Sequence, residues 1–188
     1  QDRALEVLRR TDQTKLNLEM AATDEMVEIA CRIRPEQCTL VPEKRQELTT
    51  EGGLDVLGNL ACISKATGRL HEAGILVSLF VDPATEQIRA SKQSGADAIE
   101  IHTGRYAEAR SEKSRHHELA AIREAIRLGN ELGLTVHAGH GLNYVNILPL
   151  TGLTGIEEFN IGHSIISRAM LVGLDRAVRE MVALIRRP

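Results

Sequence analysis

The stretch LGLTVHAGHG, Leu132 to Gly141, indicates the fold class most directly. Gly133 stands where a helix is expected to end, residues 134–138 form a short apolar run typical of a buried strand, and polar, glycine-rich residues follow. Glycine also stands between a helical pattern and an apolar run at Gly74 and Gly95. This repeated junction predicts parallel strands joined by crossover helices.

Six apolar runs occur along the chain, separated by stretches whose apolar residues lie three and four positions apart. This alternation is typical of an α/β fold, and the repeated glycine junctions favour a (β/α)8 TIM barrel over an open doubly wound sheet. The expected strands are Lys15–Met20, Cys38–Val41, Ile75–Val81, Ala98–His102, Leu134–Ala138 and Glu158–Gly162.

The chain opens on a helical pattern, Ala4–Arg10, with no strand before it. A complete eight-stranded barrel typically needs about 250 residues, whereas this sequence has 188. We therefore expect a single barrel domain over residues 1–188 that forms about the last three quarters of the barrel, with the first two βα units missing.

Composition excludes several classes of function. The chain is 43% hydrophobic and 26% charged, which suits one well-buried domain. Its 23 basic and 26 acidic residues are spread along the whole length, so there is no cationic surface for nucleic acid. The apolar runs are shorter than the roughly 18 residues of a membrane span. Three cysteines without a CxxC pair fit a reducing cytoplasm. We expect a cytoplasmic protein that binds neither nucleic acid nor membrane.

Two carboxylates fall inside apolar strand sequences. Side chains at the carboxyl ends of parallel barrel strands converge on one mouth. Glu19 and Glu100 each lie between apolar neighbours, where a carboxylate loses hydration and is either paired or raised in pKa. A single such carboxylate could instead be a structural hydrogen-bond partner. Two at equivalent strand positions favour acid or base chemistry.

Histidines gather at or near the expected strand ends. They are His102, His137, His140 and His163. Imidazoles at a barrel mouth are good metal ligands, but a metal site of the hydrolase kind needs a His-x-His strand and a terminal Asp, and the sequence has neither. We therefore expect no metal. The other three histidines, His71, His116 and His117, fall in helical stretches among charged residues, and we expect them to be solvated.

Two turns have the composition of phosphate sites. Gly141 and Gly162 each stand between a strand and the start of a helix. Glycine permits close backbone approach, and free N–H groups at a helix start attract phosphate, which is often bound at the last strands of a barrel. The segment Glu43–Gly53 directly follows a strand end and is expected to be either a solvated loop or a mobile loop over the mouth.

Five segments of the chain carry a family resemblance. They are Asn17–Met20, Leu40–Glu47 continuing into Thr49–Asp55, Ile99–Gly104, Ala138–Leu142 and Asn160–His163. In this order, and across essentially all 188 residues, the sequence resembles the pyridoxine 5′-phosphate synthase family. The resemblance implies a (β/α)8 barrel that forms a homo-octamer and uses no cofactor. The implied activity is that of a transferase of vitamin B6 biosynthesis. It condenses 1-deoxy-D-xylulose 5-phosphate with 3-amino-2-oxopropyl phosphate, giving pyridoxine 5′-phosphate, phosphate and water.

The resemblance also implies a role for each matching residue. Glu19 would be a proton acceptor, His140 a proton donor, and Glu100 would stabilise charge in the transition state. Thr49 would contact the deoxyxylulose phosphate. The aminoketone phosphate would be held by Gly141, Gly162 and His163.

The sequence departs from the family's pattern at its beginning. The family's first two strands carry a further catalytic histidine and several phosphate-binding side chains that have no counterpart among these residues. We expect a chain without them to fold poorly by itself and to turn over slowly or not at all. Two other interpretations stay open: another phosphosugar-processing barrel enzyme that uses Glu19 or Glu100 as base, and a barrel that binds phosphate ligands without catalysis.

Overall fold

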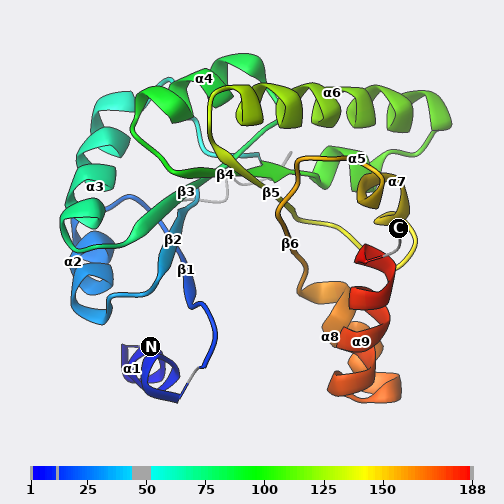
Figure 1. The fold of residues 1–188 in the computed structure, drawn as a ribbon, viewed down its shortest axis with the longest axis horizontal. Helices are drawn as coiled ribbons and strands as arrows, with labels where there is room; N and C mark the ends of the chain where they lie inside the picture. Colours follow the sequence, from blue (N-terminus) through cyan, green and yellow to red (C-terminus); the bar gives the residue numbers. More distant parts are fainter. Residues whose placement is uncertain (1, 12, 44–51, 187–188) are drawn as a thin grey trace.

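The computed structural model describes residues 2–11, 13–43 and 52–186, and these contain one sheet of six parallel strands (Figure 1). Each strand pairs with the next one along the chain. The strands are β1 (Asn17–Met20), β2 (Gln37–Leu40), β3 (Leu76–Val81), β4 (Ala98–His102), β5 (Thr135–Gly139) and β6 (Glu158–Asn160). All six predicted strands are confirmed, with ends that differ from the prediction by no more than two residues.

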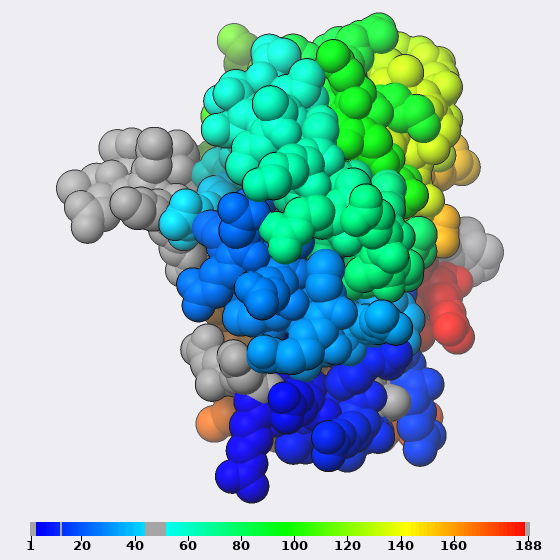
Figure 2. Space-filling model, turned by 90° about the vertical axis from the view of Figure 1, so that its left-hand side faces the viewer, coloured from blue at the N-terminus to red at the C-terminus, as the bar shows by residue number. Residues whose placement is uncertain are grey.

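Helices connect the strands, and α2, α3, α4 and α6 lie along the outside of the arc that the strands form (Figure 1). The helices are α1 (Asp2–Thr11), α2 (Asp24–Ile33), α3 (Leu60–Glu72), α4 (Thr85–Gln93), α5 (Gly104–Glu108), α6 (Glu112–Glu131), α7 (Leu148–Thr151), α8 (His163–Val172) and α9 (Leu174–Ile185). Viewed from the side of α2 and α3, the side chains of α1, α2 and α3 form a continuous outer surface (Figure 2). In the described ranges, no helix has the length and apolar character needed to cross a membrane.

Local sequence explains where these helices begin and end. The hydroxyl oxygen of Thr23 accepts a hydrogen bond from the backbone N–H of Met26 and caps the start of α2. After α3, α4 and α6 the chain turns through Gly74, Gly95 and Gly133, whose φ angles are +77°, +89° and +69°. Glycine adopts this left-handed conformation without steric penalty, so the predicted helix-ending role of these three glycines is confirmed.

The order of the strands distinguishes the two predicted α/β architectures. A doubly wound sheet reverses its strand order at a switch point, whereas here the order β1 to β6 runs in one direction. The described sheet is a curled half-barrel, which confirms the α/β class but not a closed eight-stranded barrel. Three statements stay predictions: that the barrel closes with eight strands, that its first two βα units are missing, and that residues 1–188 form a single domain.

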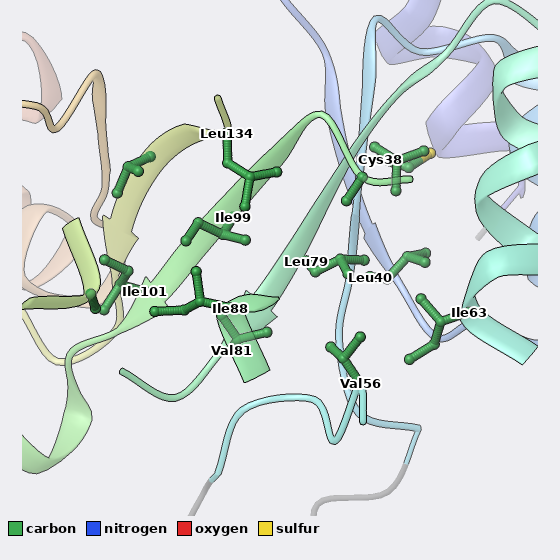
Figure 3. Close-up of a cluster of buried hydrophobic side chains, with 14 of the residues drawn as sticks. Cys38, Leu40, Val56, Ile63, Leu79, Val81, Ile88, Ile99, Ile101 and Leu134 are labelled. Carbon is green, nitrogen blue, oxygen red and sulfur yellow. The ribbon is translucent and has the colours of Figure 1, made fainter. Parts of the chain in front are cut away.

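The hydrophobic core lies between the sheet and the helices outside it (Figure 3). Alternate strand residues point outward, as in Leu79 and Val81 of β3 and Ile99 and Ile101 of β4, and each of these side chains is fully buried. They pack with helix residues of the same cluster such as Ile88 of α4. Because this apolar layer is on the outer face, the inner face of the strands is available for other side chains.

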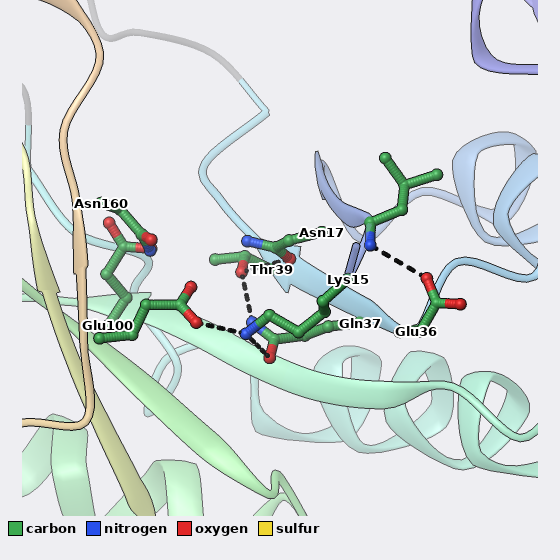
Figure 4. Close-up of polar contacts among 9 residues, drawn as sticks. Lys15, Asn17, Glu36, Gln37, Thr39, Glu100 and Asn160 are labelled. Atoms are coloured by element: carbon green, nitrogen blue, oxygen red, sulfur yellow. Dashed lines mark hydrogen bonds and ion pairs between the residues drawn. The ribbon is translucent and has the colours of Figure 1, made fainter. Parts of the chain in front are cut away.

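The inner face of the sheet is polar, although barrel interiors are usually filled with branched apolar side chains. Its polar members, hereafter the inner face, are Asn17, Glu19, Gln37, Thr39, Ser78, Glu100, His102, His137, Glu158 and Asn160. Figure 4 shows how several of them approach one another. Lys15, just before β1, donates hydrogen bonds to Glu158 Oε2 of β6 at 2.5 Å and to Gln37 Oε1 of β2 at 3.5 Å. These bonds link the two ends of the strand arc.

Candidate active site

Glu100 is the most perturbed acid of the inner face. It lies in the middle of β4, is 4% exposed, and accepts a hydrogen bond from Asn160 Nδ2 of β6 at 2.6 Å (Figure 4). Burial raises the pKa of Glu100 to about 7; the Asn160 hydrogen bond opposes this rise, and the negative charges of Glu19 and Glu158 add to it. A carboxyl group with this pKa exchanges protons near neutral pH, as acid–base catalysis requires. The predicted desolvation of Glu100 is confirmed.

Glycine at position 139 makes room for this carboxyl group. A Cβ on Gly139 would lie 2.1 Å from Glu100 Oε1 and 3.1 Å from Asn160. Any side chain on this residue would therefore displace the pair formed by Glu100 and Asn160. Asn160 falls inside the predicted strand Glu158–Gly162, and no role is predicted for it from the sequence. The signal that could have indicated a role is an amide side chain two residues before Gly162, near the end of a strand.

Glu19 lies on the same inner face but is exposed, and the prediction that it loses hydration is wrong. Leu18 and Met20 are the buried residues of β1, because alternation along the strand sends them outward and sends Glu19 to the other side. The structure nevertheless brings the two predicted carboxylates into electrostatic range, since the charge of Glu19 contributes to the raised pKa of Glu100.

His140 and Gly141 form the turn that follows β5. Both have left-handed backbone conformations, with φ angles of +79° and +74°. The hydroxyl of Thr103 lies 2.6 Å from the carbonyl oxygen of His140 and 2.7 Å from that of Gly139, so it donates to these carbonyls and holds the turn against the end of β4. A Cβ on Gly141 would lie 2.7 Å from the Cβ of Ala107. The exposed imidazole of His140 is thus presented at the carboxyl edge of the sheet.

Three rings meet at this edge. The ring centroid of His102 lies 4.9 Å from that of Phe80 and 4.9 Å from that of His140, and Phe80 and His140 are 6.2 Å apart. His102 Nδ1 is 2.9 Å from Asp82 Oδ1 at the end of β3. This hydrogen bond holds the pKa of Asp82 below its ordinary value. The sequence pattern places His102 at a strand end but does not predict its contact with Asp82.

The remaining predicted site residues fall in different places. Gly162 and His163, both exposed, are the N-cap and first residue of α8. They follow β6 at the same sheet edge as His140, as predicted. Thr49 lies outside the described residues, as does most of the loop Glu43–Gly53. Its last residue, Gly53, donates its backbone N–H to Asp82 Oδ1 at 3.2 Å.

Other histidines are set apart from this cluster. His137 is buried on the inner face, where desolvation lowers its pKa. The predicted exposure of the helical histidines His71, His116 and His117 is confirmed. In the described ranges, no three or more His, Cys, Asp or Glu side chains are grouped as metal ligands would be. A surface cavity of about 640 Å³ along α6 and another of about 510 Å³ between the end of α6 and the start of β5 are lined by none of the predicted site residues.

Comparison with solved structures supports the architecture. The fold is similar to that of KGPDC from Streptococcus mutans, with a TM-score of 0.67 and 16% identity over 97% of this chain and 77% of that one. A second similar structure is the Amycolatopsis orientalis BexX/CysO complex, with a TM-score of 0.51 and 16% identity over 86% of this chain and 65% of that one. At these identities the likeness concerns the fold alone.

Sequence comparison identifies the family. A protein of Trichlorobacter lovleyi named pyridoxine 5′-phosphate synthase is 92% identical over all 188 residues, which cover 79% of its length. A protein of the same name from Pelobacter propionicus is 65% identical over 186 residues, covering 99% of this chain and 78% of that protein. Residues 1–187 match the family model described as pyridoxal phosphate biosynthesis protein PdxJ. The chain therefore belongs to the PdxJ family, as its sequence resemblance predicts.

Proposed function

We propose that this protein condenses 1-deoxy-D-xylulose 5-phosphate with 3-amino-2-oxopropyl phosphate to give pyridoxine 5′-phosphate, phosphate and water. The observation that carries the proposal is the buried Glu100 in the middle of β4, whose pKa is raised to about 7 and which accepts a hydrogen bond from Asn160, in a chain of the PdxJ family. Both substrates are phosphorylated, which agrees with the glycine turns after β5 and β6.

The reaction needs repeated proton transfers. An amine adds to a ketone, water and phosphate leave, and a ring closes, so groups that gain and lose protons near neutral pH are required at several steps. In our proposal Glu19, whose side chain is exposed, accepts a proton from the substrate, and His140 at the turn after β5 donates one to the leaving oxygen. Glu100 stabilises the charge that develops between them, with one carboxyl oxygen fixed by Asn160.

Binding of the aminoketone phosphate is assigned to Gly141, Gly162 and His163. The backbone N–H groups at the start of α8 have no side-chain cap, and the helix dipole favours an anion there. Thr49, outside the described residues, is assigned to the deoxyxylulose phosphate. The family resemblance further leads us to propose a cytoplasmic homo-octamer with an eight-stranded barrel and a reaction that uses no cofactor.

The test is an assay with both substrates that follows the pyridoxine chromophore. We expect Glu19→Gln and His140→Asn each to lower kcat by about 10²- to 10⁴-fold, the usual contribution of a general acid or base. His117→Asn, which changes an exposed histidine of α6, serves as the matched control and keeps full activity. If the protein forms no product and both site variants bind the phosphorylated substrates as the parent does, the protein is a non-catalytic binder. Product formation with unchanged kcat in both variants would refute the assigned roles.

A further inference from the structure

Asp82, which is half-buried, and His102, which is buried, form a hydrogen-bonded pair that has no role in the function proposed above. The side chain of His102 is 2% exposed and that of Asp82 is 28% exposed, and the two come from the ends of the neighbouring strands β3 and β4. An ionised carboxylate only accepts hydrogen bonds, so the 2.9 Å contact requires the proton of His102 to sit on Nδ1. Asp82 therefore fixes both the tautomer and the rotation of the His102 ring.

The other nitrogen of His102 makes no hydrogen bond with the described residues. His102 Nε2 is buried and has no hydrogen-bond partner among them. A Cβ on Gly104 would lie 2.6 Å from it, so glycine at this position allows the close approach of the ring. Burying a ring nitrogen without a hydrogen-bond partner lowers the stability of the folded protein, and a catalytic role is one explanation for keeping such a group.

The ring of His102 also contacts His140. The two centroids are 4.9 Å apart with an interplanar angle of 64°, an edge-to-face contact, and Phe80 packs on His102 from another side at 4.9 Å. Thr103, the next residue after His102, holds the backbone carbonyl of His140. The orientation of the His140 imidazole is therefore coupled to that of His102, which in turn depends on Asp82.

We infer that Asp82 and His102 are positioning residues that orient the imidazole of His140 for proton donation. Asp82 anchors the His102 ring through Nδ1, and the edge-to-face contact between the two rings holds the imidazole of His140 at the carboxyl edge of the sheet. The backbone N–H of Gly53 binds the same Asp82 oxygen, so the end of the 43–53 loop is attached to this pair. The inference rests on the proposed role of His140.

The experiment is a double-mutant cycle between Asp82→Asn and His140→Asn in the condensation assay. In the parent protein, Asp82→Asn is expected to lower kcat about 10- to 100-fold, the scale seen when hydrogen-bond partners that orient metal-ligating histidines are removed, with KM changed less than about threefold. In the His140→Asn background it is expected to lower kcat by less than about twofold, because the ring that it orients is gone. His71→Gln is the matched control. It removes another histidine bonded to an aspartate, Asp97 at 2.8 Å, away from the ring cluster, and should keep kcat.

A readout independent of activity accompanies the cycle. Long-range ¹H–¹⁵N spectra of the histidine rings should show His102 as the Nδ1–H tautomer in the parent and in His140→Asn, and a loss of this signature in Asp82→Asn. Equal loss of kcat in both backgrounds, or kcat within twofold of the parent in Asp82→Asn, would overturn the inference. If Asp82→Asn fails to fold, His102→Asn takes its place in the cycle with the same criteria. Full activity of His140→Asn alone would instead refute the proposed proton donor.

Discussion

Replacing Glu100 by glutamine should change how the stability of the protein depends on pH. The pKa of Glu100 rises from an ordinary value of 4.5 to about 7 in the folded protein. The folded state therefore binds this proton more tightly than the unfolded chain, and stability falls as the pH rises between these two values. At about 1.4 kcal/mol for each pH unit, the ionisation of Glu100 costs about 3 kcal/mol by pH 8. The side chain is 4% exposed, so solvent screening does not reduce this figure appreciably.

The assay is urea unfolding at pH 4.5 and at pH 8, for the parent and for Glu100→Gln. The free energy of unfolding of the parent relative to the variant should fall by about 3 kcal/mol between the two pH values, because all other titrating groups contribute equally to both proteins. Glu28→Gln changes an exposed carboxylate on α2 and is the control. If the free energies of unfolding of the parent and of Glu100→Gln differ by the same amount at both pH values, within about 0.5 kcal/mol, the raised pKa of Glu100 is refuted.

Three substitutions probe the parts of the fold that support the site. Gly139→Ala would place a Cβ 2.1 Å from Glu100 Oε1, and we expect about 1–3 kcal/mol of destabilisation together with lost activity, measured by urea unfolding and by turnover; unchanged turnover would contradict the close approach. Thr23→Ala removes the cap of α2 and should cost about 1 kcal/mol in the unfolding free energy with kcat unaffected. Leu79→Ala opens a cavity in the fully buried layer outside β3 and should lower the free energy of unfolding by about 2–5 kcal/mol; a loss below about 1 kcal/mol would place this side chain outside the core.

Short apolar runs and glycine junctions were sufficient to locate every strand of the described sheet, because both report local chemistry. An apolar run such as 98–102 predicts a strand from its own residues, and a glycine such as Gly133 marks a left-handed turn that other residues rarely adopt. The approach of the first strand to the last depends on contacts between distant elements, such as Lys15 with Glu158. No local pattern determines such a contact.

Prediction of the site succeeded for single residues and failed for pairs. Glu100 was correctly expected to be desolvated, because its apolar neighbours on β4 predict burial of the whole strand. Glu19 has similar neighbours, but β1 alternates between a buried outer face and an accessible inner face, so the same argument gave the wrong result. His102 and Asp82 lie 20 residues apart in the sequence, and Glu100 and Asn160 lie 60 residues apart. Both contacts depend on which strands lie side by side in the sheet, and the spacing of residues along the sequence gives no direct measure of that.

The polar inner face lets each strand contribute to stability with its outward residues and to the chemistry of the site with its inward residues. Outward residues such as Leu79 and Ile99 contribute apolar burial against the helices, while inward residues such as Ser78 and Glu100 contribute little to that burial. An exchange of one inward side chain for another can therefore alter proton affinity or ligand preference while the hydrophobic layer behind it stays intact. In an evolving lineage, new specificities could arise on this surface with only a small thermodynamic penalty, which makes the scaffold tolerant of chemical innovation.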